Sequence, residues 1–230
     1  RPMCTQCVVP TEVRSICVDC AGRGRGNLFG SARAARPRQW GRVRLSAQTP
    51  VVTYAIIGVC VALWVGDILT KGMITQYLGF TPIHGLYQPW RILTTAFLHV
   101  NLMHIAFNMV SLYAVGRALE PALGRGPYFC LYLLSALGGT LGVLGWVLID
   151  PSSALTVTVG ASGAIFGLFG SVFVLQRAAG IDVRAVAGLL AVNLLYGFIV
   201  SGVSWQAHLG GLIFGMLATW GMLALGKPRS

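Results

Sequence analysis

Charged side chains are scarce in this sequence, and acidic ones are the scarcest. Of its 230 residues only 10% are charged and only six are Asp or Glu, whereas 55% are hydrophobic. A soluble domain carries about 25% charged residues, which cover its surface. The composition therefore excludes an ordinary soluble globular protein and predicts a chain that lies largely in a lipid bilayer.

Long apolar stretches recur along most of the chain. A transmembrane helix needs about 20 apolar residues. Six segments reach or approach this length: 50–69, 94–116, 127–149, 160–176, 183–203 and 205–225. Because backbone groups in hydrocarbon must be satisfied within a segment, we expect an all-α membrane protein with six helices. The expected organisation has three parts: a cysteine-rich segment (1–21), a basic flexible linker (22–47) and the membrane domain (48–226).

The basic residues are unevenly distributed. Nine of the 17 Lys and Arg precede residue 45, directly before the first apolar segment. With the N-terminus in the cytosol, 15 of the 17 fall on the cytosolic side, which fits the positive-inside rule and places both termini there. The net charge of +11 is compatible with nucleic-acid binding. However, a basic segment beside a membrane span favours anionic lipid, so we expect no nucleic-acid partner.

Strongly polar side chains are rare within the apolar segments, where they are costly and usually functional. His104 and Asn108 lie in the second segment, His208 lies in the sixth, and Ser162 opens the fourth. Counted from the nearest cytosolic cation, His104, Ser162 and His208 lie roughly 20 to 28 Å above the cytosolic face. This similar depth predicts that the side chains meet.

These residue types fit nucleophilic catalysis. A serine needs a base to take its proton, and His208 is the intramembrane candidate. His104 and Asn108 share one helix face, and with the backbone N–H of Ser162 they are suited to holding an oxyanion. Small-residue faces would let the fourth and sixth helices pack closely, with serine opposite histidine. The glycines concerned are Gly160, Gly163, Gly167 and Gly170 in the fourth segment, and Gly210, Gly211 and Gly215 in the sixth.

Four motifs, in this order, resemble those of the rhomboid family. They are Trp90-Arg91, His104-x3-Asn108, Gly160-x-Ser162-Gly163 and Ala207-His208-x-Gly210-Gly211. The resemblance covers about residues 50 to 225. It implies a six-helix rhomboid bundle in a bacterial plasma membrane, acting as an intramembrane serine protease without a catalytic cofactor. The implied substrates are single-pass membrane proteins, cut in or near their transmembrane segment.

The resemblance also implies roles for individual residues. Ser162 would attack the scissile carbonyl, and His208 would activate it and then protonate the leaving amine. His104, Asn108 and the Ser162 amide would form the oxyanion hole. Phe166, one turn after Ser162, stands where the family often has an aromatic ring packed on the catalytic histidine.

Other functions stay open on the residues alone. Each polar residue could simply join helices, and some rhomboid relatives are inactive chaperones or adaptors, although these typically lack the serine or histidine. A transporter is disfavoured because no paired broken helices recur in two halves. The HExxH motif of metalloproteases is absent, and an aspartyl site needs two intramembrane Asp, whereas only Asp67 lies near a span end.

Two CxxC pairs stand near the N-terminus, at Cys4, Cys7, Cys17 and Cys20. Such pairs favour tetrahedral zinc binding, and a reduced cytosolic location disfavours disulfides. The segment resembles the small cysteine-rich modules that precede some bacterial rhomboids. We therefore expect a structural zinc site, with the alternative that the pairs belong to two interleaved sites whose other ligands are missing. Because the chain starts at Arg1 rather than Met, we also expect residues upstream to be missing.

Overall fold

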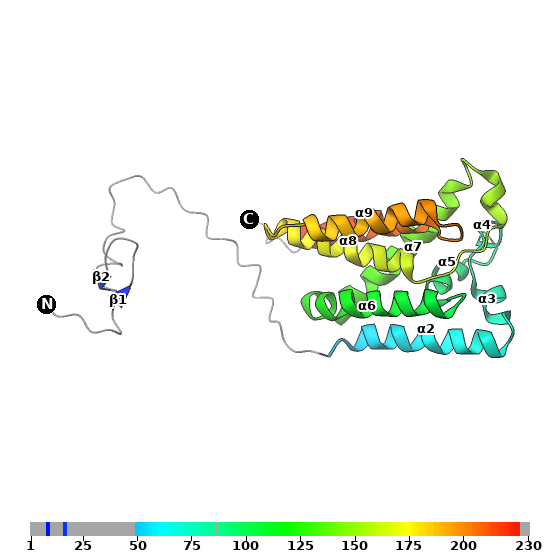
Figure 1. Ribbon diagram of the computed structural model, residues 1–230, viewed down its shortest axis with the longest axis horizontal. Coiled ribbons are helices and arrows are strands. Elements are labelled where there is room, and N and C mark those ends of the chain that lie inside the picture. Colours follow the sequence, from blue (N-terminus) through cyan, green and yellow to red (C-terminus); the bar gives the residue numbers. More distant parts are fainter. Residues whose placement is uncertain (1–7, 10–15, 18–48, 86, 226–230) are drawn as a thin grey trace. The chain divides into compact units, whose positions relative to one another are not determined.

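The computed structural model describes residues 8–9, 16–17, 49–85 and 87–225 (Figure 1). The chain divides into two compact units, 1–43 and 44–230. In the first unit, β1 (Val8–Val9) and β2 (Ile16–Cys17) pair antiparallel, with Val8 opposite Cys17.

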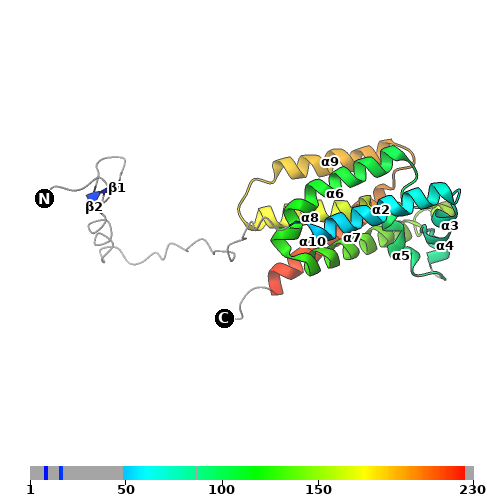
Figure 2. The same cartoon turned by 90° about the horizontal axis from the view of Figure 1, so that it is seen from below.

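The second unit is a helical bundle (Figure 1, Figure 2). Its long helices are α2 (Val51–Leu69), α6 (Leu102–Leu123), α7 (Arg125–Trp146), α8 (Ser162–Ala178), α9 (Arg184–Ile199) and α10 (Trp205–Leu225). Its short helices are α3 (Met73–Leu78), α4 (Pro82–Gly85), α5 (Arg91–Thr94), η2 (Thr95–Phe97) and η3 (Pro151–Leu155).

The six long helices lie on the six apolar segments that the sequence predicts. Among the described residues, α2, α6, α7 and α10 are long and apolar enough to cross a membrane. The other two, α8 and α9, are apolar but shorter, with 17 and 16 residues. The predicted all-α membrane bundle is therefore confirmed.

The predicted second segment, 94–116, is wrong at both ends. Its first residues form η2 and a loop, and α6 begins only after Asn101, whose side chain accepts a hydrogen bond from the backbone N–H of His104. Pro121 lies in the last turn of α6. A proline there removes only one hydrogen bond, and the helix ends before Gly124.

The centre of the bundle lies where α7, α8 and α10 cross, and glycines bring these backbones together. A Cβ on Gly211 of α10 would overlap the carbonyl oxygen of Gly163 in α8, and one on Gly215 would overlap that of Gly167. Such contacts between small-residue faces are typical of helices in membranes. This confirms the predicted close packing, which sets the start of α8 beside α10.

A buried carboxylate joins the start of α2 to the end of α6. Glu120 accepts hydrogen bonds of 2.8 to 2.9 Å from the backbone N–H groups of Val52 and Thr53 and from the Thr53 hydroxyl. N–H groups in the first turn of a helix have no partner within that helix. Glu120 therefore caps α2 from a neighbouring helix.

The segment between α2 and α6 folds around Arg91, which is buried. The guanidinium donates to the carbonyl oxygens of Gln76 and Gly79, at 2.8 and 2.6 Å. Phe80 then pairs with Thr158 through two backbone hydrogen bonds, of 3.2 and 2.7 Å. The first loop is thereby tied to the segment that leads into α8.

Candidate active site

Ser162 and His208 meet where α8 and α10 begin. Ser162 is the first residue of α8, and its Oγ lies 2.9 Å from Nε2 of His208. His208 is 7% exposed, and its Nδ1 has no hydrogen-bond partner within the described part of the chain. If the neutral imidazole carries its proton on Nδ1, Nε2 can accept the proton of the Ser162 hydroxyl.

The turn before Ser162 depends on Gly160. Its φ of +135° lies in a region that side chains disfavour. A Cβ at this position would lie 2.8 Å from Nε2 of His104 and 3.6 Å from Oγ of Ser162. The backbone N–H of Gly160 donates to the carbonyl oxygen of Thr95 at 3.0 Å. A larger residue would strain this turn and fill the space between His104 and Ser162.

His104 and Asn108 lie on one face of α6, as their spacing predicts. The His104 ring borders the Gly160 turn. Asn108 is buried, and its Nδ2 donates to the carbonyl oxygen of His104 at 2.8 Å. One further N–H of this amide is available, because an amide nitrogen carries two donors. Within the described residues neither side chain bonds Ser162 directly.

His99 is a site neighbour for which the sequence carries no motif. It is 2% exposed, and its ring packs edge-on against His104 with 5.0 Å between centroids. Burial lowers the pKa of His99 to about 4, so the ring is uncharged at neutral pH. His99 lies in the loop before α6, where helical spacing cannot relate it to His104.

Phe166 stacks on His208. The ring centroids are 4.2 Å apart and the planes differ by 10°. The aromatic contact expected one turn after Ser162 is therefore present. A phenyl ring has no hydroxyl, so it fixes the imidazole by its face alone.

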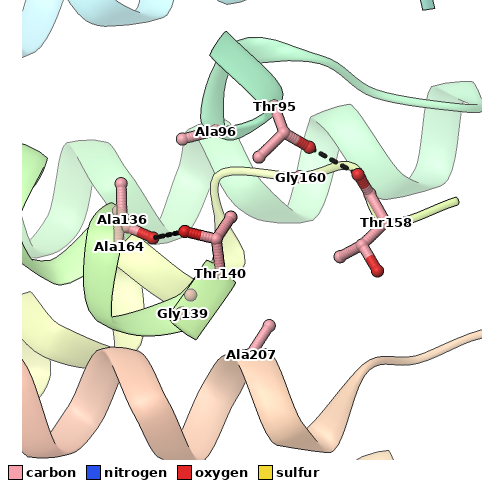
Figure 3. Close-up of a pocket in the computed structure, with 10 residues that line it drawn as sticks. Thr95, Ala96, Ala136, Gly139, Thr140, Thr158, Gly160, Ala164 and Ala207 are labelled. Carbon is pink, nitrogen blue, oxygen red and sulfur yellow. Dashed lines mark hydrogen bonds between the residues drawn. The ribbon is translucent and has the colours of Figure 1, made fainter. Parts of the chain in front are cut away.

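A small cavity of about 20 Å³ lies beside Gly160 and Gly163 (Figure 3). Its lining comes from residues far apart in the sequence: Thr95, Ala96, Ala136, Gly139, Thr140, Thr158, Gly160, Gly163, Ala164 and Ala207. The Thr95 hydroxyl donates to the Thr158 carbonyl oxygen, and the Thr140 hydroxyl donates to carbonyl oxygens of its own helix. This volume suits about one water molecule, which needs polar partners of this kind.

The predicted zinc ligands fall mostly outside the described residues. Cys17 lies in β2, whereas Cys4, Cys7 and Cys20 are outside the described ranges. Over the ranges that are described, no group of three His, Cys, Asp or Glu could hold a metal ion. The zinc site therefore stays a prediction.

Comparisons with known proteins find similar chains. A family model described as the Rhomboid domain matches residues 86–225. The chain is 34% identical to the rhomboid protease GluP of Bacillus subtilis over 149 residues, which are 61% of this chain and 27% of GluP. It is 35% identical to YdcA of the same species over 184 residues (74% and 87%). It is 30% identical to the rhomboid protease GlpG of Yersinia enterocolitica over 187 residues (76% and 64%).

Proposed function

This chain belongs to the rhomboid family, and we propose that it is an active serine endopeptidase of the membrane, with Ser162 as nucleophile and His208 as base. The observation that carries the proposal is the 2.9 Å distance between Ser162 Oγ and His208 Nε2 inside a bundle of apolar helices. Serine and base within hydrogen-bond reach are the signature of an activated nucleophile.

The reaction follows from this pair in two stages. Ser162 Oγ attacks the scissile carbonyl carbon while Nε2 of His208 takes the hydroxyl proton. The imidazolium then gives that proton to the leaving amine as the peptide C–N bond breaks, which leaves an acyl-enzyme ester. A water molecule attacks the ester, again losing its proton to His208, and the returning proton restores the Ser162 hydroxyl. The Phe166 ring holds the imidazole in place through both stages.

Negative charge on the substrate oxygen needs donors. The backbone N–H of Ser162 stands at the N-terminus of α8, where it has no partner within the helix. The His104 ring beside Gly160 and the second N–H of Asn108 are the other donors of this oxyanion hole. The gap that Gly160 leaves between His104 and Ser162 supports this role. His99 keeps the His104 ring oriented.

The second stage needs water inside a protein that is otherwise apolar. The cavity beside Gly160 and Gly163 has the volume of about one water molecule and threonine hydroxyls on its wall. It lies next to the turn that carries Ser162. We assign to it the water that hydrolyses the acyl-enzyme.

The protein is an integral membrane protein, and its substrates would be other membrane proteins. Our proposal is narrower: single-pass proteins of a bacterial plasma membrane, cut in or near their transmembrane segment. The excess of Lys and Arg on one side supports cytosolic termini and an active site that opens to the opposite face. No cofactor takes part, because serine and histidine supply both nucleophile and base.

Labelling by a fluorophosphonate probe tests this proposal on the full chain in detergent. We expect wild type to be labelled and to cleave a single-pass substrate, and Ser162→Ala to do neither. Ser171→Ala is the matched control, because Ser171 is a buried serine of the same helix without a described hydrogen-bond partner. Folded wild-type protein without labelling or cleavage would instead indicate an inactive relative that works as a chaperone or adaptor.

A further inference from the structure

An exposed cation stands on the outer face of the bundle, away from the serine. Arg117 of α6 is exposed, and its guanidinium lies over the ring of Tyr113, with 5.8 Å from the guanidinium carbon to the ring centroid. Within the described part of the chain it forms no ion pair with a carboxylate. A cation on a lipid-facing helix is costly unless it meets an anion or water.

Two stacked tyrosines, Tyr113 and Tyr54, lie beside the Arg117 guanidinium. Tyr113 stacks on Tyr54 of α2, with 6.1 Å between centroids and 25° between planes. Both rings are exposed, 41% and 46% respectively. Tyrosines on lipid-facing surfaces concentrate at the level of the headgroups, which places Arg117 at the membrane surface.

The start of α2 and the end of α6 lie at the same level as the two tyrosines. Tyr54 lies in the first turn of α2, and Glu120, one turn after Gly116 and Arg117, caps this same turn. Arg117 is therefore level with the start of α2. The charge distribution of the sequence predicts that this end of the bundle faces the cytosol.

An apolar seam continues from the tyrosines toward the bilayer centre. On α2 it follows Gly58 and Val61, and on α6 it follows Val110 and Phe107, all of them exposed. Nothing lies within 4 Å of the position that a Cβ on Gly58 would take, so the surface of α2 is open there. A cation above an exposed apolar surface matches the polarity of a phospholipid, with its charged head above its acyl chains.

We propose that Arg117, Tyr113 and Tyr54 bind the headgroup of an anionic phospholipid, whose acyl chain lies along the seam of α2 and α6. The phosphate pairs with the guanidinium, which offers several donors in one plane. The tyrosine rings hold that guanidinium by a cation–π contact and border the glycerol region. An anionic lipid is favoured over a zwitterionic one because Glu120, the one carboxylate on α6, is buried and bonded to α2 and so cannot pair with a choline ammonium beside Arg117.

Native mass spectrometry of the full chain in detergent tests the site. Phosphatidylglycerol and phosphatidylcholine with identical acyl chains are added, and the fraction of protein that retains one lipid is measured. We expect wild type to prefer phosphatidylglycerol, and Arg117→Gln to lose roughly fivefold in apparent affinity, the contribution of one arginine at an anionic surface. Arg125→Gln is the matched control: Arg125 is exposed at the same end of the bundle but has no aromatic contact within the described residues, so we expect a smaller loss than for Arg117→Gln, and equal losses would overturn the proposal.

Further variants separate the sources of binding. Arg117→Lys keeps the charge but not the planar guanidinium, so its preference should lie between those of wild type and Arg117→Gln, and it tests the site even if Arg117→Gln folds poorly. Tyr113→Leu should weaken retention. Equal retention of both lipids by wild type, or unchanged retention by folded Arg117→Gln, overturns the proposal. Displacement of the lipid by millimolar inorganic phosphate would also overturn it, because the site would then recognise free phosphate.

Discussion

The imidazole of His208 lies flat against the phenyl ring of Phe166, with 4.2 Å between the ring centroids. Ser162 and Phe166 are one turn apart on α8, so a single helix carries both the hydroxyl that meets Nε2 and the ring that fixes the imidazole plane. The His208 Nδ1 has no partner among the described residues, and no carboxylate there orients the ring. The stacking contact therefore takes over the orienting role that an aspartate fills in a triad.

Phe166→Leu should consequently slow catalysis while the protein still folds. An aromatic pair contributes about 0.5 to 1.5 kcal/mol beyond simple burial, so we expect kcat/KM to fall roughly two- to tenfold. Phe166→Tyr keeps the ring and should stay close to wild type. Cleavage kinetics of a transmembrane substrate measure both variants. A rise in KM with kcat unchanged would contradict an orienting role for Phe166.

Removing one oxyanion donor should slow catalysis less than removing the nucleophile or the base. Removing one donor typically costs on the order of 100- to 1,000-fold in kcat, so we expect losses of that size for His104→Ala and Asn108→Ala. His208→Ala should approach the loss of Ser162→Ala, because members of a catalytic unit are not additive.

Asn193→Ala is a close control for Asn108→Ala. Asn193 of α9 also donates to the carbonyl oxygen four residues earlier, at 2.8 Å, but it is exposed. Its replacement should leave turnover unchanged. Equal turnover in Asn108→Ala and Asn193→Ala would reassign Asn108 to helix packing.

The helices and the polar cluster could be predicted because the bilayer leaves few alternatives. A long apolar segment must form a helix there, and a strongly polar residue inside it is costly and therefore usually functional. Ser162, His208 and His104 are therefore identifiable as candidate site residues from the sequence alone. Their common depth followed from the constant rise of a helix.

Features that depend on single contacts could not be predicted from the sequence. The start of α6 depends on the Asn101 cap, and hydropathy averages across such a position. Glu120 lies just beyond the predicted apolar segment 94–116, yet it is buried and accepts hydrogen bonds from α2, which is far from it in the sequence. The contact of His99 with His104 likewise arises from a loop conformation that no periodic pattern encodes.

Glu120→Gln should destabilise the bundle without touching the serine. The carboxylate accepts from two first-turn N–H groups of α2, those of Val52 and Thr53, whereas an amide would turn a donor toward one of them. Hydrogen bonds to charged groups contribute about 1.5 to 3 kcal/mol, and we expect a loss of that order in the free energy of unfolding. Thermal denaturation in detergent measures it. Asp182→Asn, at an exposed loop carboxylate, should have no effect, and a similar shift in both variants would contradict the capping role.

Gly211→Ala should abolish catalysis through packing. The added methyl group would overlap the Gly163 carbonyl oxygen, so α10 must move away from α8 and carry His208 from Ser162. Overpacking of this kind costs about 1 to 3 kcal/mol of stability, and the catalytic distance is lost as well. Gly221→Ala in the same helix meets nothing within 4 Å and should be neutral. Probe labelling and thermal denaturation of both variants test the difference, and full labelling of a folded Gly211→Ala would contradict it.

The N-terminal segment should be separable from proteolysis. The proposed catalytic groups are a serine, histidines, an asparagine and a backbone amide, and in a serine–histidine mechanism none of them serves as a metal ligand. The charge distribution also predicts that the cysteines and the opening of the active site lie on opposite sides of the membrane. A chain that starts at Gln48 should therefore keep its cleavage activity in detergent, and a chelator should leave the activity of the full chain intact.

Zinc binding by this segment is tested on the full chain by metal analysis. In the described hairpin Val8 pairs with Cys17, so one of the four cysteines lies in a paired strand. We expect zinc in the purified protein and its loss in the double variant Cys17→Ser, Cys20→Ser, because thiolates are the ligands. Cys130→Ser, at an exposed cysteine of α7, should retain the metal. Wild type without zinc would refute the metal site, and loss of cleavage in the shortened chain would make the N-terminal segment part of the enzyme.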